Sequence, residues 1–157
     1  MSDDFTATLP RKRMGAGVLF HDPAGRVLLV EPTYKPWWEL PGGAVEADES
    51  PRAAAAREVA EELGLTIVPG RLLVVDWVPP RPGRTEGVMF VFDGGEVHTE
   101  AAARIRVPPD ELRGWAWCTA AEAEERLSPL LARRTVAALA AVVDGTTAYL
   151  HDGHAPE

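Results

Sequence analysis

The strongest constraint on the fold is one segment that carries the signals expected at the start, in the interior and at the end of a helix. Ser50 is a good amino-terminal cap, and Pro51 suits the first helical turn. The interior includes Ala53–Ala56, and alanine is the best helix former. Gly64 is a typical carboxyl-terminal stop. The sequence therefore predicts a helix over residues 51–63.

Three carboxylates of this helix share one face. Glu58, Glu61 and Glu62 stand at positions i, i+3 and i+4, where like charges repel one another by a few tenths of a kcal/mol per pair. Oxygen ligands on one rigid face suit Mg²⁺ or Mn²⁺, which keep several waters and bridge to phosphate groups. The alternative interpretation is an acidic face in open solvent. The residues that flank the helix favour the metal site.

A longer pattern surrounds these carboxylates. Residues 43–65 contain a glycine, five residues, a glutamate, seven residues, arginine-glutamate, an aliphatic residue, any residue, two glutamates, any residue, a glycine and an aliphatic residue. This stretch resembles the Nudix box and meets each of its specified positions. Those positions are Gly43, Glu49, Arg57, Glu58, Val59, Glu61, Glu62, Gly64 and Leu65. The sequence Leu40-Pro41-Gly42-Gly43 before the helix also agrees with the family.

The resemblance implies both a fold and an activity. The fold is α/β, a Nudix-type α/β/α sandwich built on a mixed β-sheet. The activity is hydrolysis of a diphosphate linkage in a nucleoside diphosphate derivative, such as a dNTP, ADP-ribose or an NDP-sugar, by attack of water on phosphorus. The implied cofactor is Mg²⁺, with Mn²⁺ as an alternative. The implied metal ligands are Gly43, Glu49, Glu58, Glu61 and Glu62, with hydrogen bonding within the box as the alternative role of Glu49 and a tight turn as that of Gly43.

The resemblance also implies catalytic roles. Arg57 is expected to orient a carboxylate of the box, and the three helix glutamates are expected to act in catalysis through the metal. In this family the general base can be a box glutamate or an acid from a later loop. The later acid here is Glu111, with Glu96 and Glu100 as alternatives. Each of these three acids can instead be a solvated surface residue.

Aromatic and basic residues outside the box are candidates for substrate binding. Tyr34, Trp37 and Trp38 precede the box, where an aromatic ring could stack on a nucleobase. Arg81 and Arg84 lie in a proline-rich loop and could meet phosphate or ribose. The alternatives are a core or rim position for the aromatic residues and a solvated loop for the arginines.

The remaining segments complete an α/β pattern. Apolar and alternating runs that end at glycine, proline and aspartate clusters predict strands. These strands are expected over 13–20, 26–31, 71–78, 87–92, 104–107 and 115–118. The first two are expected to form a hairpin, and the third and fourth to be neighbours. Helices are expected over 119–127 and 129–143.

The length of 157 residues fits one domain. We expect an N-terminal extension over 1–12, the Nudix domain over 13–145 and a C-terminal tail over 146–157, whose structure the sequence leaves open. The longest apolar run, 136–143, is far shorter than the roughly 20 residues that span a bilayer. The amino terminus lacks a signal-peptide pattern, and the lone Cys118 excludes an internal disulfide. We therefore expect a soluble, cytoplasmic protein without a membrane partner.

The charge of the chain narrows the class of partner. A net charge of -8 argues against broad contact with DNA, RNA or an anionic membrane. Between residues 43 and 65, six acids face two bases, so half of this charge lies in the box. A divalent cation can neutralise it, which leaves a small phosphorylated molecule as the expected partner rather than a nucleic-acid polymer. The sequence fits a monomer and a homodimer equally well.

Two other functions fit parts of the pattern. The same fold could hydrolyse a non-nucleotide diphosphate, such as an isoprenoid or inositol derivative. A Nudix-fold sensor could bind a nucleotide sugar without hydrolysing it. Such sensors often carry a degraded box or an added DNA-binding domain, and this sequence shows neither.

Overall fold

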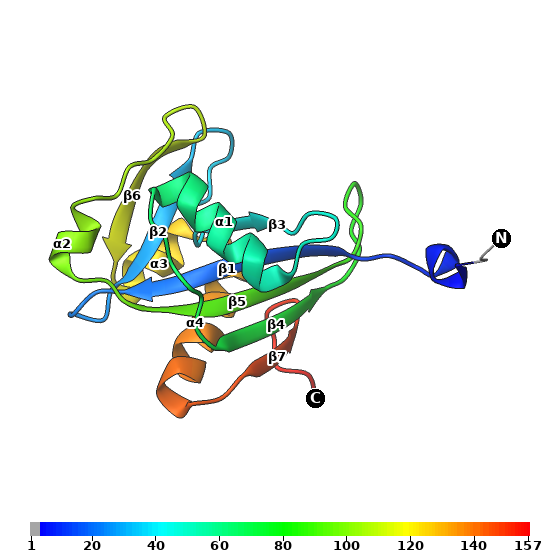
Figure 1. Cartoon of the computed structure of the whole chain (residues 1–157). Coiled ribbons are helices and arrows are strands. Elements are labelled where there is room, and N and C mark those ends of the chain that lie inside the picture. Colours follow the sequence, from blue (N-terminus) through cyan, green and yellow to red (C-terminus); the bar gives the residue numbers. More distant parts are fainter. Residues whose placement is uncertain (1–3) are drawn as a thin grey trace.

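The computed structural model describes residues 4–157, which contain a seven-stranded sheet with helices on both faces (Figure 1). The strands are β1 (Arg13–His21), β2 (Val27–Pro32), β3 (Gly42–Ala44), β4 (Leu72–Val78), β5 (Gly87–Glu96), β6 (Leu112–Cys118) and β7 (Ala148–His151). The helices are the 3₁₀ helix η1 (Phe5–Thr8), α1 (Pro51–Leu63), α2 (Thr99–Ala102), α3 (Ala120–Arg126) and α4 (Pro129–Asp144). Within the described residues, no helix is long and apolar enough to cross a membrane.

The strands form a mixed sheet. Their order is β6-β2-β1-β5-β4-β7, and β3 pairs with β1 beside this path. β1 runs parallel to β5, and β4 runs parallel to β7. The other pairs are antiparallel, and they include the expected β1–β2 hairpin and the expected β4–β5 neighbours. The predicted mixed sheet and both predicted strand pairs are confirmed.

Helices cover the two faces of this sheet separately, with α1 in front and α3 and α4 behind it (Figure 1). Successive side chains of β1 supply both layers because they point to opposite faces. Val18 joins the apolar cluster that contains Val59 and Leu63 of α1. Leu19 joins the second cluster, which contains Ala138 of α4. Two apolar layers on one sheet confirm the predicted α/β/α sandwich.

Helix α1 has the bounds that the sequence predicts. Ser50 Oγ accepts a hydrogen bond from Ala53 N at 3.1 Å and so caps the amino end. Gly64 ends the helix in the left-handed conformation, with a φ of 69°. Val59 and Leu63 are buried against the sheet. Local capping and apolar burial together therefore fix the orientation of the acidic face.

The expected strand over 104–107 is wrong. The segment after α2 is irregular, although Ile105 is buried. The backbone N–H of Ile105 bonds to Ala102, and that of Arg106 bonds to Leu63 at the end of α1. The apolar residue that indicated a strand is thus buried in a loop that seals the end of α1.

The segment 146–157 contributes β7 to the edge of the sheet. Asp76 of β4 is 0% exposed and accepts a hydrogen bond from Gly153 N at 3.0 Å. It also pairs with Arg134 of α4, with 2.8 Å between Oδ2 and Nε. This buried ion pair joins β4, α4 and the chain after β7. Strand β6, which precedes β7 in the chain, begins at Leu112 rather than at the expected residue 115.

Candidate active site

Strand β3 and helix α1 bring the two ends of the box together. β3 places Gly43 opposite Ala16 of β1, and α1 packs on the same region of the sheet. A Cβ added to Gly43 would lie 2.5 Å from the carboxyl carbon of Glu58. A side chain at position 43 would therefore displace this carboxyl group, so glycine leaves the space that the Glu58 carboxylate occupies.

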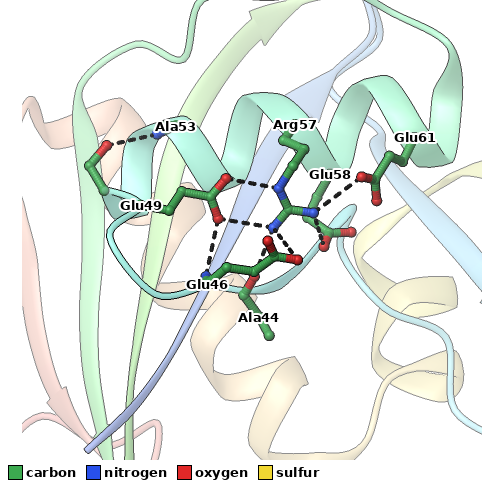
Figure 2. Close-up of polar contacts among 8 residues, drawn as sticks. Ala44, Glu46, Glu49, Ala53, Arg57, Glu58 and Glu61 are labelled. Carbon is green, nitrogen blue, oxygen red and sulfur yellow. Dashed lines mark hydrogen bonds and ion pairs between the residues drawn. The ribbon is translucent and has the colours of Figure 1, made fainter.

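Arg57 lies at the centre of the box and holds its acidic residues in place (Figure 2). Its Nε and Nη2 atoms donate to the two carboxylate oxygens of Glu49 at 2.8 and 3.0 Å. Nη1 donates to Glu58 Oε1 at 3.0 Å and to Glu61 Oε1 at 3.2 Å. Nη2 also donates to the carbonyl oxygen of Ala44 at 3.1 Å. All three nitrogens are engaged within the box, so this geometry suits orientation of carboxylates better than binding of phosphate.

Glu49 ties the loop before α1 to the helix. Its Oε1 atom accepts a second hydrogen bond, from Glu46 N at 3.1 Å. Hydrogen bonds from Arg57 and from this backbone N–H lower the pKa of Glu49. The same contact with Glu49 raises the pKa of the Arg57 guanidinium. Both oxygens of Glu49 are therefore occupied in this arrangement, and the residue stays charged.

Glu62 is a buried carboxylate, only 6% exposed. Its Oε1 atom accepts a hydrogen bond from Gly42 N at 3.0 Å. Burial raises the pKa of Glu62 to about 8, and this hydrogen bond offsets the effect only in part. The carboxylates of Glu58, Glu39 and Glu111 raise the pKa further by repulsion. Negative charge at this position is thus unfavourable until a cation joins it.

Glu58 and Glu61 complete the acidic face. Burial raises the pKa of Glu58, against the opposing effect of Arg57, and repulsion from Glu61 and Glu111 adds to the rise. The side chain of Glu61 is more accessible, with 54% of its surface exposed. Carboxylates that repel one another in a partly buried site favour a divalent cation, because the cation supplies the opposite charge.

The donors present suit a hard metal ion. Carboxylate oxygens are the ligands that Mg²⁺ prefers, and the glutamates of α1 supply several on one face. Within residues 4–157, no group of three or more His, Cys, Asp or Glu side chains is already arranged to hold a metal ion. Mg²⁺ does not require such a cage, because it keeps several waters and is held by one or two carboxylates plus substrate phosphates. These donors therefore fit a hard divalent cation.

Glu111 lies in the turn that precedes β6. Its backbone carbonyl accepts a hydrogen bond from Thr33 N at 2.9 Å, which holds this turn against the end of β2. Its side chain is exposed, and its charge raises the pKa of both Glu58 and Glu62. The structure thus brings Glu111 into the neighbourhood of the box.

The two alternative acids lie elsewhere. Glu96 ends β5 and pairs with His21 at the end of β1. That position is roughly 16 Å along β1 from Ala16, the residue opposite Gly43. Glu100 follows in α2. Distance therefore separates both acids from the carboxylates of α1.

The aromatic candidates before the box point in different directions. Trp38 packs against the core beneath α3 and α4, and the guanidinium of Arg126 lies 4.6 Å from the centre of its ring. Its backbone N–H also donates to Arg126 O at 2.9 Å. Trp37 and Tyr34 are 44% and 72% exposed. Trp38 is thus committed to packing, whereas the other two rings remain accessible.

The two arginines expected to meet substrate lie in the loop between β4 and β5. Arg81 forms an ion pair with Asp152, and its backbone pairs with that of Arg84. In the part of the chain that the structure describes, neither arginine contacts the carboxylates of α1. Arg81 instead connects the loop to the segment after β7.

The family model for the NUDIX domain matches residues 11–139. This span contains the whole box together with strands β1 to β6 and the first part of α4. The chain belongs to the Nudix family. The match confirms the resemblance indicated by the sequence pattern between residues 43 and 65.

Several relatives cover most of this Nudix protein. The RNA pyrophosphohydrolase of Dinoroseobacter shibae is 30% identical over 148 residues, which cover 82% of this chain and 89% of the relative. The putative 8-oxo-dGTP diphosphatase 2 of Mycobacterium tuberculosis is 37% identical over 119 residues, 73% of this chain and 76% of the relative. The crystal structure of a MutT NUDIX hydrolase from Burkholderia pseudomallei matches with a TM-score of 0.67 and 26% identity, and covers 82% of this chain and 97% of that one. The chain is an enzyme of the Nudix pyrophosphohydrolase family.

Sequence reasoning missed two residues near the Nudix box. Lys35 forms an ion pair with Glu39, and its Nζ atom lies 5.4 Å from the ring centre of Tyr34. Glu39 is also one of the carboxylates that raise the pKa of Glu62. The available signal was a pair of opposite charges at i, i+4, which is informative on a helix but not in the loop between β2 and β3.

Proposed function

We propose that the protein hydrolyses a diphosphate linkage in a nucleoside diphosphate derivative, with Mg²⁺ as cofactor and Mn²⁺ as an alternative. The observation that carries the proposal is the buried Glu62 beside Glu58, where carboxylates repel one another while Arg57 is fully engaged. A divalent cation bound to a phosphate would offset this surplus of negative charge.

The residues of the box have different roles in this proposal. The three glutamates of α1 would hold the metal, and the carbonyl of Gly43 and the carboxylate of Glu49 are the further donors that the family pattern implies. When bound, a divalent ion polarises phosphoryl oxygens and lowers the pKa of a bound water. Arg57 keeps the carboxylates oriented through its hydrogen bonds. Gly43 leaves the space that the carboxyl group of Glu58 occupies.

The attacking water also needs a proton acceptor. Glu111 is the candidate outside the box, because its exposed carboxylate acts electrostatically on Glu58 and Glu62. A box glutamate is the alternative. If Glu111 is the base, Glu111→Gln lowers kcat by about 10²- to 10⁴-fold. Full turnover in this variant would assign the role to the box.

A nucleotide is favoured over the other two kinds of ligand. The names of both sequence relatives refer to RNA or to a nucleotide, which supports a nucleotide substrate here. The complete box supports hydrolysis rather than a sensor that binds a nucleotide sugar without cleaving it. A non-nucleotide diphosphate remains the alternative substrate class.

A substrate panel tests the proposal. Purified protein is incubated with Mg²⁺ or Mn²⁺ and with dNTPs, 8-oxo-dGTP, ADP-ribose, NADH, dinucleoside polyphosphates or NDP-sugars in oxygen-labelled water. We expect metal-dependent cleavage, no cleavage with EDTA, and the label on a phosphate product, as identified by mass. Isoprenoid and inositol diphosphates form the non-nucleotide arm. Cleavage confined to that arm contradicts the substrate class, and no cleavage in either arm contradicts the proposal.

A further inference from the structure

The loop between β2 and β3 is braced beside the acidic face. At its base, Val30 and Glu39 exchange two backbone hydrogen bonds, of 2.8 and 3.0 Å. At the start of the loop, the backbone N–H of Thr33 donates to the carbonyl of Glu111 at 2.9 Å. Residues 33–37 are therefore presented to solvent from a fixed base, which is the arrangement expected of a binding loop rather than of a loose connection.

This loop leaves two large rings in water. Tyr34 is 72% exposed and Trp37 is 44% exposed, although the neighbouring Trp38 is partly buried against the core. Tyrosine and tryptophan combine a large apolar area with a polar group, and both are therefore common at binding surfaces. The exposed rings belong to a loop that adjoins the site, because Thr33, the residue before Tyr34, bonds to the carbonyl of Glu111, and the loop ends at Gly42, whose backbone N–H donates to Glu62 at 3.0 Å. Partial burial and, after it, repulsion from Glu39 raise the pKa of Tyr34.

The loop also carries a cation that is free to change partner. Lys35 has 38% of its side chain exposed and pairs with a single carboxylate, that of Glu39. Arg57, in contrast, donates to two glutamates of α1 and to Glu49, and it cannot leave them without disordering the box. A lysine ammonium is a compact charge on a flexible stem, so Lys35 can exchange Glu39 for a phosphate oxygen without movement of the backbone.

We propose that Tyr34 and Lys35 form the subsite for the nucleotide half of the substrate, with the base stacked on the Tyr34 ring and Lys35 paired with a phosphate oxygen. This inference rests on the proposed function and states how that site selects a nucleotide. The Lys35 Nζ atom lies over the Tyr34 ring, 5.4 Å from its centre, so one ligand can reach both the ring and the ammonium group. Stacking does not depend on one particular base, so the subsite recognises a nucleobase as a class.

The chain itself supplies matched controls. It contains two tyrosines and two lysines, and one of each lies outside the loop between β2 and β3. Tyr149 is 57% exposed on the edge strand β7. Lys12 has 45% of its side chain exposed and pairs with Glu86. Tyr149→Leu and Lys12→Met therefore remove the same chemistry as Tyr34→Leu and Lys35→Met, but at remote positions.

Calorimetric titration with two probes tests the subsite. The probes are α,β-methylene-ADP, whose bridging carbon blocks hydrolysis, and inorganic pyrophosphate, which has no base, each with Mg²⁺. Tyr34→Leu should weaken binding of the nucleotide analogue by about tenfold, at the low end of base–aromatic stacking, and leave pyrophosphate binding unchanged. Tyr34→Phe should keep the affinity because it keeps the ring. Lys35→Met should weaken both probes, because both carry phosphate.

Two results would overturn the subsite: affinities of Tyr34→Leu and Lys35→Met equal to those of the remote controls, or an equal loss of both probes in Tyr34→Leu. Failure of the proposed function has a different signature, because the unmodified protein would then show no metal-dependent hydrolysis. A protein that hydrolyses nucleotides while both loop variants bind as the controls do contradicts the subsite alone.

Discussion

Two arginine–carboxylate groups in this molecule differ in their balance of charge. In the box, the Arg57 guanidinium donates hydrogen bonds to Glu49, Glu58 and Glu61. Glu62 belongs to the same acidic group, because the charge of Glu58 raises its pKa. Behind the sheet, one arginine meets one aspartate, in a pair whose side chains are 9% and 0% exposed. The backbone N–H of Gly153 donates a hydrogen bond to the second carboxylate oxygen of that aspartate. The first group has surplus negative charge, and the second has none.

The difference separates a site for chemistry from a structural contact. A buried ion pair avoids a large desolvation cost only when its charges match and its oxygens are hydrogen-bonded, as those of Asp76 are. Glu62 does not meet this condition, because burial and neighbouring carboxylates raise its pKa to about 8. Folding retains it although, among residues 4–157, the hydrogen bond to its carboxylate comes from the backbone N–H of Gly42 and not from a cationic side chain. Such a residue is explained by a ligand that brings positive charge, and not by stability.

The largest effect is expected where the surplus charge lies. Glu62→Gln should lower kcat/KM by at least about a thousandfold, since a metal site contributes several kcal/mol to transition-state stabilisation. The metal-free variant should be at least as stable as the parent, because the substitution replaces a carboxyl group whose ionised form is disfavoured by burial and by repulsion from Glu58. Steady-state kinetics with Mg²⁺ and thermal unfolding in EDTA measure the two effects. Glu125→Gln, an exposed acid of α3, is the control, and equal activity of the two variants would contradict the assignment.

The charge-matched group should respond in the opposite way. Asp76→Asn leaves the charge of Arg134 buried without its partner and should lower the free energy of unfolding by about 3–5 kcal/mol. Activity per folded molecule should stay within about twofold, since α4, which carries Arg134, covers the face of the sheet opposite α1 (Figure 1). Urea unfolding and active-fraction kinetics measure these values. Asp144→Asn, at the exposed end of α4, should change stability by under about 0.5 kcal/mol. Similar losses in both variants would show that the pair is not a structural contact.

Removal of the space beside Glu58 should have an intermediate effect. In Gly43→Ala the new Cβ would lie 2.5 Å from the Glu58 carboxyl carbon, and the flexible end of that side chain would move aside. We expect kcat/KM to fall by about a hundredfold, as for other small displacements of catalytic groups, with little change in stability. Gly114→Ala is matched, because its Cβ meets nothing within 4 Å. The test compares kcat/KM of the two variants at equal Mg²⁺ concentration. A fully active Gly43→Ala would mean that Glu58 tolerates displacement.

The sequence predicts the box and its helix because their signals are local. Ser50 and Gly64 mark the two ends of α1, and the spacing of the glutamates places them on one face whatever the rest of the fold does. The strands β1, β2, β4 and β5 are predicted for a similar reason, since each contains a local run of mostly apolar residues. Their exact ends differ where pairing continues past the apolar residues, as in β5, which extends to Glu96.

Segments that depend on distant partners could not be predicted. Ile105 is buried like a strand residue, but its neighbour Arg106 bonds to the end of α1, a contact that no local pattern encodes. Strand β7 depends on its register with β4, where Tyr149 lies opposite Val75. In the loop before β3, Trp38 is partly buried against the core, and this irregular segment has no periodicity that would distinguish it from the exposed Trp37.

The smallest expected effect concerns the direction of a pH dependence. Hydrogen bonds from Trp77 and Lys12 lower the pKa of Glu86 below its ordinary value of 4.5. A carboxylate of this kind contributes stability above its unfolded pKa, and the contribution is lost as the pH falls through the folded value. Glu62 behaves oppositely in the metal-free protein: its raised pKa means that stability is lost as the pH rises toward 8.

Urea unfolding in EDTA between about pH 6 and pH 3 measures the effect of Glu86. The stability difference between the parent and Glu86→Gln should shrink as the pH falls, because protonation removes the same charge that the substitution removes. Above pH 6 the comparison turns to Glu62→Gln, whose stability advantage over the metal-free parent should grow up to about pH 8 and vanish with saturating Mg²⁺. Parallel slopes in the two variants would contradict the comparison, because the acids of the box and those of the charge-matched contacts would then respond alike.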